Sequence, residues 1–220
     1  MPFPDLVHQW RQIIVFISVL SMALGAIAAI GQTNIKRLMA YSSIGHMGYA
    51  LLGLAAGTSL GARGVLIYLA IYVFTNLGVF AAIQAMRRKG EAVENISDLA
   101  GLSRNQPMLA LVFALLFFSL AGVPPLAGFF GKFYVFLAAI EAGLVVPAVL
   151  GVLASTIGLV YYLRVVKIMY FDEPAAPFDG VEGFGSRAIL GLSAAVALLF
   201  IVAASPVITA ADAAAKALLP

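Results

Sequence analysis

The sequence predicts an all-α membrane protein, a polytopic bundle of about six transmembrane helices of which one is discontinuous. Of its 220 residues, 63% are hydrophobic and only 10% are charged, and the mean hydropathy is +1.04. The apolar stretches are long and continuous rather than alternating, which indicates helices. A helix needs about 20 apolar residues to cross the hydrocarbon core, and its backbone must be hydrogen-bonded internally.

Six long apolar stretches are the predicted spans. In chain order they are residues 13–30, 43–57, 64–86, 107–142, 144–169 and 188–208. A short surface helix is expected in the long connection between the third and fourth spans, with Asn95 or Ser97 as its N-cap.

The basic residues gather in alternate connections, and this pattern predicts the direction of the spans. One side holds nine of the 13 Lys and Arg residues: Lys36, Arg37, Arg87, Arg88, Lys89, Arg104, Arg164, Lys167 and Arg187. The other side holds Arg11, Arg63 and Lys216. Basic loops stay in the cytoplasm, so both termini are predicted to face outward.

The fourth span contains SLAGVPPLAGFFGKFYVF, residues 119–136, in which two prolines interrupt an apolar run. Residues 107–142 as one straight helix would be about 54 Å long, more than the bilayer core accommodates. Pro124 and Pro125 lack amide hydrogens, so the carbonyls of Leu120 and Ala121 lose their usual partners. We therefore predict two half-helices that are joined by an unwound linker over residues 121–127.

Lys132 follows this interruption and lies about 15 Å from the outer end of the second half-helix, near the middle of the membrane. Unwound backbone at that depth requires a protein environment or a wet cavity, and discontinuous helices mark ion sites in transporters. A permanent ammonium there is costly. We predict that Lys132 takes up and releases protons; the alternatives are a simple proline kink and a lysine that extends to the interface.

The second span opens with AYSSIGHMGY and places His46 one turn after Ser42. A histidine changes its charge near neutral pH and can pass protons through either ring nitrogen. His46 is therefore a candidate for the proton path. A hydrogen-bonded packing histidine near the cytoplasmic boundary is the equally weighted alternative.

The third span reads YLAIYVFTNLGVF, so Tyr68, Tyr72 and Asn76 form an i, i+4, i+8 stripe. Tyr72 and Asn76 fall in mid-membrane. Such a stripe either holds helices together or lines a hydrated path, and the broken helix favours the path. Tyr72 and Asn76 join Lys132 and His46 as the predicted proton-path residues.

No residues of this chain are predicted to bind a cofactor or a metal. The chain has no cysteine, which excludes disulfides, iron–sulfur ligation and thiolate metal sites. No span has a histidine pair for haem, no glycine-rich phosphate loop follows a strand, and no nucleophile, base and acid occur together. Covalent catalysis has no support.

Two stretches, QTNIKRLMAYSSIGHMGY (32–49) and SLAGVPPLAGFFGKFYVF (119–136), resemble the antiporter-like membrane subunits of respiratory complex I. Within that family the lysine of GFFGKF is similar to that of the N-type subunits. The resemblance implies a proton-translocating part of NADH:quinone oxidoreductase with Lys132 as the lysine of the second broken helix. It also implies that NADH, FMN, iron–sulfur clusters and quinone bind to other subunits, and that other membrane subunits of complex I and the lipid bilayer are its partners, with no nucleic acid.

Family members are about twice as long and contain two inverted repeats, each with a broken helix, whereas one broken helix is visible here. The resemblance therefore implies a C-terminal fragment. Residues 1–170 correspond to the second repeat with its outer N-terminal loop, and 171–220 to a cytoplasmic connector, the final helix and an outer tail. Two other functions stay open: a subunit of a multi-subunit sodium/proton antiporter, and a scaffold of the complex that moves no proton.

Overall fold

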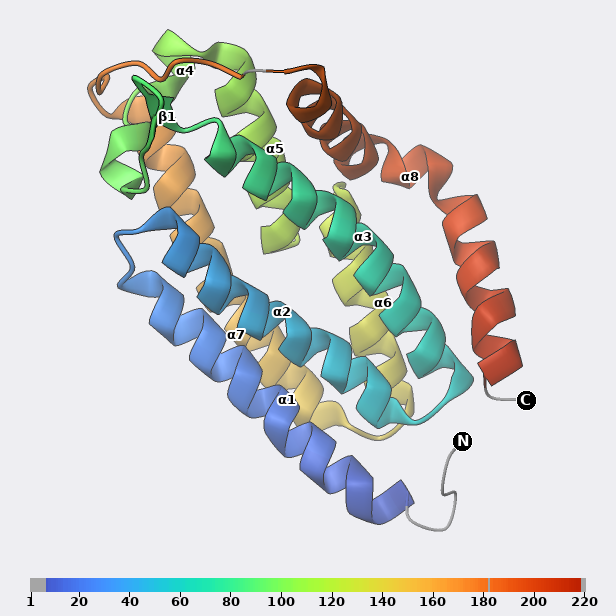
Figure 1. The fold of residues 1–220 in the computed structure, drawn as a ribbon. Coiled ribbons are helices and arrows are strands. Elements are labelled where there is room, and N and C mark those ends of the chain that lie inside the picture. Colours follow the sequence, from blue (N-terminus) through green and yellow to red (C-terminus); the bar gives the residue numbers. More distant parts are fainter. Residues whose placement is uncertain (1–6, 182, 219–220) are drawn as a thin grey trace.

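The computed structural model describes residues 7–181 and 183–218, and these form a helical bundle (Figure 1). The predicted all-α membrane fold is confirmed. The long helices and half-helices are α1 (Val7–Ile30), α2 (Ile35–Ala56), α3 (Ser59–Gln84), α5 (Pro107–Ala121), α6 (Ala127–Glu141), α7 (Val145–Phe171) and α8 (Phe184–Leu218). The short elements are β1 (Arg87–Arg88), β2 (Glu91–Ala92), the 3₁₀ helix η2 (Ile96–Leu99) and α4 (Leu102–Asn105).

Four helices are long and apolar enough to cross a membrane singly: α1, α3, α7 and α8. The half-helices α5 and α6 have 15 residues each, and a crossing takes about 20, so the two cross as a pair. Residues 122–126 between them are not helical. The predicted interruption is thus confirmed within about one residue at each end.

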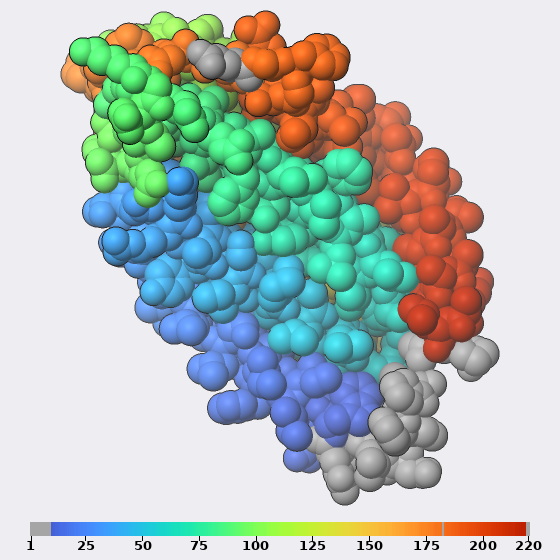
Figure 2. Space-filling view, in the orientation of Figure 1, coloured from blue at the N-terminus to red at the C-terminus, as the bar shows by residue number. Residues whose placement is uncertain are grey.

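The helices pack as two adjoining layers around the broken helix. Figure 2 shows α1, α2, α3 and α8 side by side on one face, and α5, α6 and α7 lie behind α2 and α3 in Figure 1. The largest buried cluster joins α2, α3, α5 and α7 and includes Leu38, Phe113, Phe117 and Val165. Leu120 and Ala121, next to the break, belong to this cluster.

The three basic connections meet at one end of the bundle. The amide of Ile35 donates to the carbonyl of Glu94 at 2.8 Å, and that of Asp179 donates to the carbonyl of Arg87 at 2.8 Å. Lys36 pairs with the Glu94 carboxylate at 2.6 Å, and its hydrogen bond lowers the pKa of that carboxyl. The beginning of α1 and the end of α8 lie at the opposite end (Figure 1).

Several observed helices begin or end away from the predicted spans: α1 begins at Val7 rather than at residue 13 and α3 at Ser59 rather than at residue 64, and the second and last spans differ most. The second begins at Ile35 rather than at residue 43, because the Asn34 side chain accepts from the amide of Arg37 and caps a helical turn that carries two basic residues. The last extends to Leu218 and bends at Ala203, near an internal proline. The predicted cap Asn95 does precede the surface turn η2, without a side-chain cap bond.

Candidate functional site

The helix break has a defined local geometry. Helix α5 ends at Gly122, whose left-handed backbone (φ 86°) suits a residue without a side chain. The Pro124–Pro125 peptide bond is cis. The amide of Gly128 in the first turn of α6 donates to Ser119 Oγ at 3.1 Å, and a Cβ on Gly128 would lie 1.8 Å from the Ser119 carbonyl oxygen. The two half-helices therefore touch backbone to backbone at the break.

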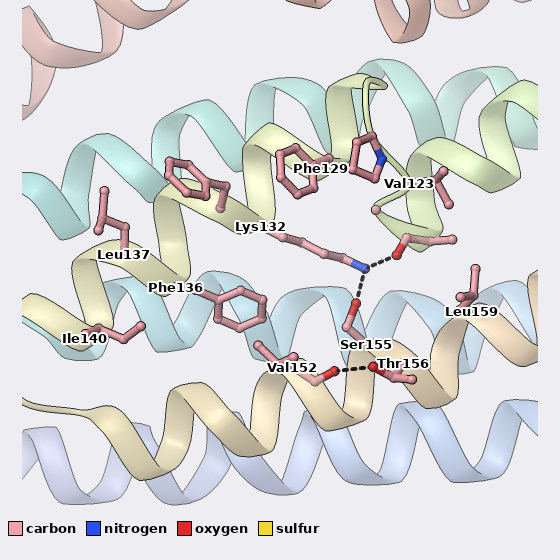
Figure 3. Close-up of a pocket in the computed structure, with 14 residues that line it drawn as sticks. Val123, Phe129, Lys132, Phe136, Leu137, Ile140, Val152, Ser155, Thr156 and Leu159 are labelled. Carbon is pink, nitrogen blue, oxygen red and sulfur yellow. Dashed lines mark hydrogen bonds between the residues drawn. The ribbon is translucent and has the colours of Figure 1, made fainter.

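Lys132 extends from α6 toward this break (Figure 3). It is only 7% exposed. Its Nζ donates to the carbonyl oxygen of Ala121 at 3.0 Å and to Ser155 Oγ of α7 at 2.8 Å, and it lies 5.1 Å from the centre of the Tyr49 ring. The carbonyl that the prolines leave free thus accepts from the lysine, and the negative end of the α5 dipole favours an ammonium there.

A cavity of about 470 Å³ lies between the break, α6 and α7. Figure 3 shows Phe129, Phe136 and Leu159 among its apolar lining residues. Lys132 and Ser155 supply polar atoms to the same wall. The amine therefore faces an apolar cavity on one side, and its hydrogen bonds hold it against the break on the other.

His46 of α2 lies in a buried hydrogen-bond network. It is 5% exposed. Its Nδ1 is 2.5 Å from the Tyr68 hydroxyl of α3, and its Nε2 is 3.1 Å from the Tyr162 hydroxyl of α7. The Tyr162 hydroxyl also bonds Ser42 Oγ. Both ring nitrogens are thus satisfied by side chains from two other helices.

Two small cavities connect His46 to Lys132. One is lined by both residues together with Tyr68, Thr75 and Ser119. The other is lined by both together with Ser42, Tyr161 and Tyr162. Each has a volume of about 10 Å³, close to the lower limit for one water molecule. The imidazole and the amine therefore border the same two small spaces, whose linings include hydroxyl groups.

The other two predicted residues, Tyr72 and Asn76, lie on helix α3, and only Tyr72 is close to His46. The Tyr72 ring is 5.1 Å from the His46 ring, but its hydroxyl donates to Ser43 Oγ at 2.9 Å rather than to the imidazole. Asn76 Oδ1 is buried without a hydrogen bond among the described residues. Thr75, its neighbour, lines the first small cavity instead.

Sequence reasoning missed the contribution of α7. Ser155 and Tyr162 are seven residues apart, so they lie on one face of that helix, and this face meets both Lys132 and His46. The spacing is a usable signal, although α7 also carries Thr156 and Tyr161, and the sequence does not show which face is turned inward. Among the described residues no cluster suited to a metal ion is found.

A family model described as "NADH:quinone oxidoreductase/Mrp antiporter, TM" matches residues 1–158. NADH-quinone oxidoreductase subunit N of Parvibaculum lavamentivorans is 66% identical over 99% of this chain and 45% of its own length. The chain thus spans about 45% of the length of the curated relatives that it matches.

Solved structures show the same fold. A chain of respiratory complex I from Thermus thermophilus with bound NADH has a TM-score of 0.80 and 29% identity, over 97% of this chain and 46% of that one. A chain of the Mrp complex from Dietzia has a TM-score of 0.83 and 22% identity, over 96% and 48%, which shows the fold alone. The resemblance to N-type subunits is confirmed, and this chain belongs to the NADH:quinone oxidoreductase/Mrp antiporter transmembrane family.

Proposed function

We propose that this chain carries protons across the membrane as part of a NADH:quinone oxidoreductase, with Lys132 as its central proton carrier. The observation that carries the proposal is the buried Lys132 amine at the helix break, held by Ala121 and Ser155. A lone ammonium inside a membrane is costly. Such a group is retained where its charge is used, and the similarity to subunit N supplies the reaction that drives it.

His46 and Tyr72 are the further members of the proposed path, since both surround the approach to Lys132. Asn76 has the weakest support of the four, because it lies outside the residues that line the cavities around Lys132. Residues 1–170 would act as the proton-carrying repeat, and 171–220 as the connector, final helix and tail.

The orientation follows from the charge pattern. The Lys and Arg residues of the three connections share one end of the bundle, and the positive-inside bias places that end in the cytoplasm. Both ends of the chain would then face the periplasm of a bacterial inner membrane. NADH, FMN, iron–sulfur clusters and quinone would bind to other subunits of the complex, and other membrane subunits would be the partners.

The test is Lys132→Met in the protein as its host assembles it, with Lys89→Met in the surface hairpin as the control. Inverted membrane vesicles are energised with NADH, and proton uptake is measured with a pH-sensitive dye beside the rate of NADH oxidation. We expect Lys132→Met to lose proton uptake and the control to keep it. An assembled Lys132→Met complex that pumps normally would refute the proposal and support the scaffold.

The antiporter alternative is favoured by the shared fold and by the family model, whose description also covers Mrp antiporters. The same vesicles separate the two functions, because a redox-driven pump acidifies its lumen only during NADH turnover. A sodium/proton antiporter exchanges the ions along an imposed gradient without any substrate oxidation. Sodium-dependent collapse of a pH gradient without NADH, abolished in Lys132→Met, would replace the proposed function with this one.

A further inference from the structure

We propose that Tyr162 and Tyr68 hold His46 between them as a proton relay with two tautomeric states, which delivers protons from Ser42 to the cavity beside Lys132. This inference rests on the proposed proton translocation and deepens it. It assigns roles to Tyr162 and Ser42, which the motif analysis did not place on the path.

The geometry supports a continuous chain of hydrogen bonds. Ser42 Oγ bonds the Tyr162 hydroxyl, which lies 3.1 Å from Nε2 of His46, and Nδ1 lies 2.5 Å from the Tyr68 hydroxyl. All four residues are at most 5% exposed. They come from α2, α3 and α7, so the chain is built by helix packing and is not a local feature of one helix.

The chemistry of a neutral imidazole makes this arrangement bistable. One ring nitrogen carries a hydrogen and the other accepts one, so one tyrosine must donate to His46 while the other accepts from it. In the first state Tyr162 donates to Nε2, and Nδ1–H donates to Tyr68. In the second state Nε2–H donates to Tyr162, and Tyr68 donates to Nδ1.

One proton converts the first state into the second. Ser42, at the end of the chain away from His46, accepts a proton and gives its own hydrogen to Tyr162. The hydrogen of Tyr162 passes to Nε2. The Nδ1–H bond breaks as the hydrogen moves to Tyr68, whose own hydrogen leaves for the cavity and, through one water, for the Lys132 amine. Every hydroxyl ends with one hydrogen, and one positive charge has moved. Before a second proton can follow, the hydroxyls rotate, and the imidazole hydrogen moves from Nε2 back to Nδ1 through water in the small cavities that border the ring, so that it does not retrace the tyrosine chain.

The cavity beside Tyr68 is the proposed exit of the relay. The cavity that touches Tyr68 also touches Lys132, Thr75 and Ser119, so a water there has several polar partners. The cavity that touches Ser42 and Tyr162 also borders His46 and Lys132. His46 has a hydroxyl at each nitrogen, as any buried imidazole requires, and a further hydroxyl lies behind Tyr162, which extends the chain beyond the histidine.

The test compares Tyr162→Phe with Tyr170→Phe in the assembled complex. Both substitutions remove one hydroxyl from α7, and that of Tyr170 makes no hydrogen bond within the described part of the chain. We expect Tyr162→Phe to lose NADH-driven proton uptake and Tyr170→Phe to retain it. Infrared spectra of imidazole ring vibrations should show two His46 tautomers in the parent protein and one in Tyr162→Phe, a change that lost packing alone does not produce.

A second pair of variants keeps the proposal testable if Tyr162→Phe fails to assemble. Ser42→Ala should lose proton uptake, and Ser42→Thr, which retains the hydroxyl, should restore it. If Lys132→Met abolishes uptake while Tyr162→Phe and Ser42→Ala pump normally, the relay is refuted and the proposed function stands. If Lys132→Met pumps normally, the proposed function itself fails.

Discussion

Gly122→Ala is the substitution that tests most directly whether the helix break positions Lys132. Gly122 has φ 86°, a conformation that costs a residue with a Cβ about 1–2 kcal/mol. The added Cβ would lie 3.1 Å from Lys132 Cδ and 3.3 Å from Nζ. Carbon atoms prefer about 3.5–4.0 Å, so the lysine must move by a few tenths of an ångström, away from acceptors that it meets at 3.0 and 2.8 Å.

Gly143→Ala is the matched control, because Gly143 also has a positive φ (78°) after a half-helix but has nothing within 4 Å of an added Cβ. Both variants should lose about 1–2 kcal/mol of stability, measured by unfolding of the purified complex in a graded denaturing detergent. Only Gly122→Ala should lower proton uptake per NADH oxidised. Equal pumping by the two variants, at equal assembly, would show that the break does not position the amine.

Two further predictions concern hydrogen bonds on either side of the membrane boundary. Ser155→Ala removes one acceptor of the central amine and should lower proton uptake, whereas Thr156→Ala, whose hydroxyl bonds its own helix, should not; equal effects of the two would contradict the site. The amides of Lys89 and Gly90 donate to Asp179 and lower its pKa from the ordinary 3.8. The stabilisation by these hydrogen bonds is therefore present above pH 3.8 and is lost as the pH falls through the lower folded-state pKa. Hydrogen exchange of the two amides, corrected for its intrinsic rate, should accelerate in that pH range. Asp179→Asn should remove this pH dependence.

The sequence predicted the break better than the boundaries of the helices. Two adjacent prolines remove amide donors regardless of tertiary packing, so the linker could be located within about one residue. The start of α2 depended on the cap by Asn34, and two basic residues in its first turn made it resemble a loop. The end of α8 depended on a bend at Ala203 that lets the helix continue past Pro206.

The sequence predicted only those members of the candidate site whose residue type is energetically costly inside a membrane. A lysine in mid-membrane stands out in any sequence, and so does the histidine near it. Ser155 and Tyr162 are ordinary in a membrane helix, and their roles arise because α7 turns that face toward α2 and α6. Asn76 lies one helical turn after Tyr72, yet its neighbour Thr75, and not Asn76, lines the small cavity shared by His46 and Lys132.

Helix α7 makes hydrogen bonds to other helices at two points that lie far apart along its length. Near the end of α7 that adjoins the basic connections, Arg164 donates to the carbonyl of Ile30 at 2.6 Å. About 13 Å along the same rigid helix, Ser155 holds the Lys132 amine. One helix therefore carries both the contact with the end of α1 and the contact with the amine, so we expect a substitution of Arg164 that frees this end of α7 to shift Ser155 relative to Lys132.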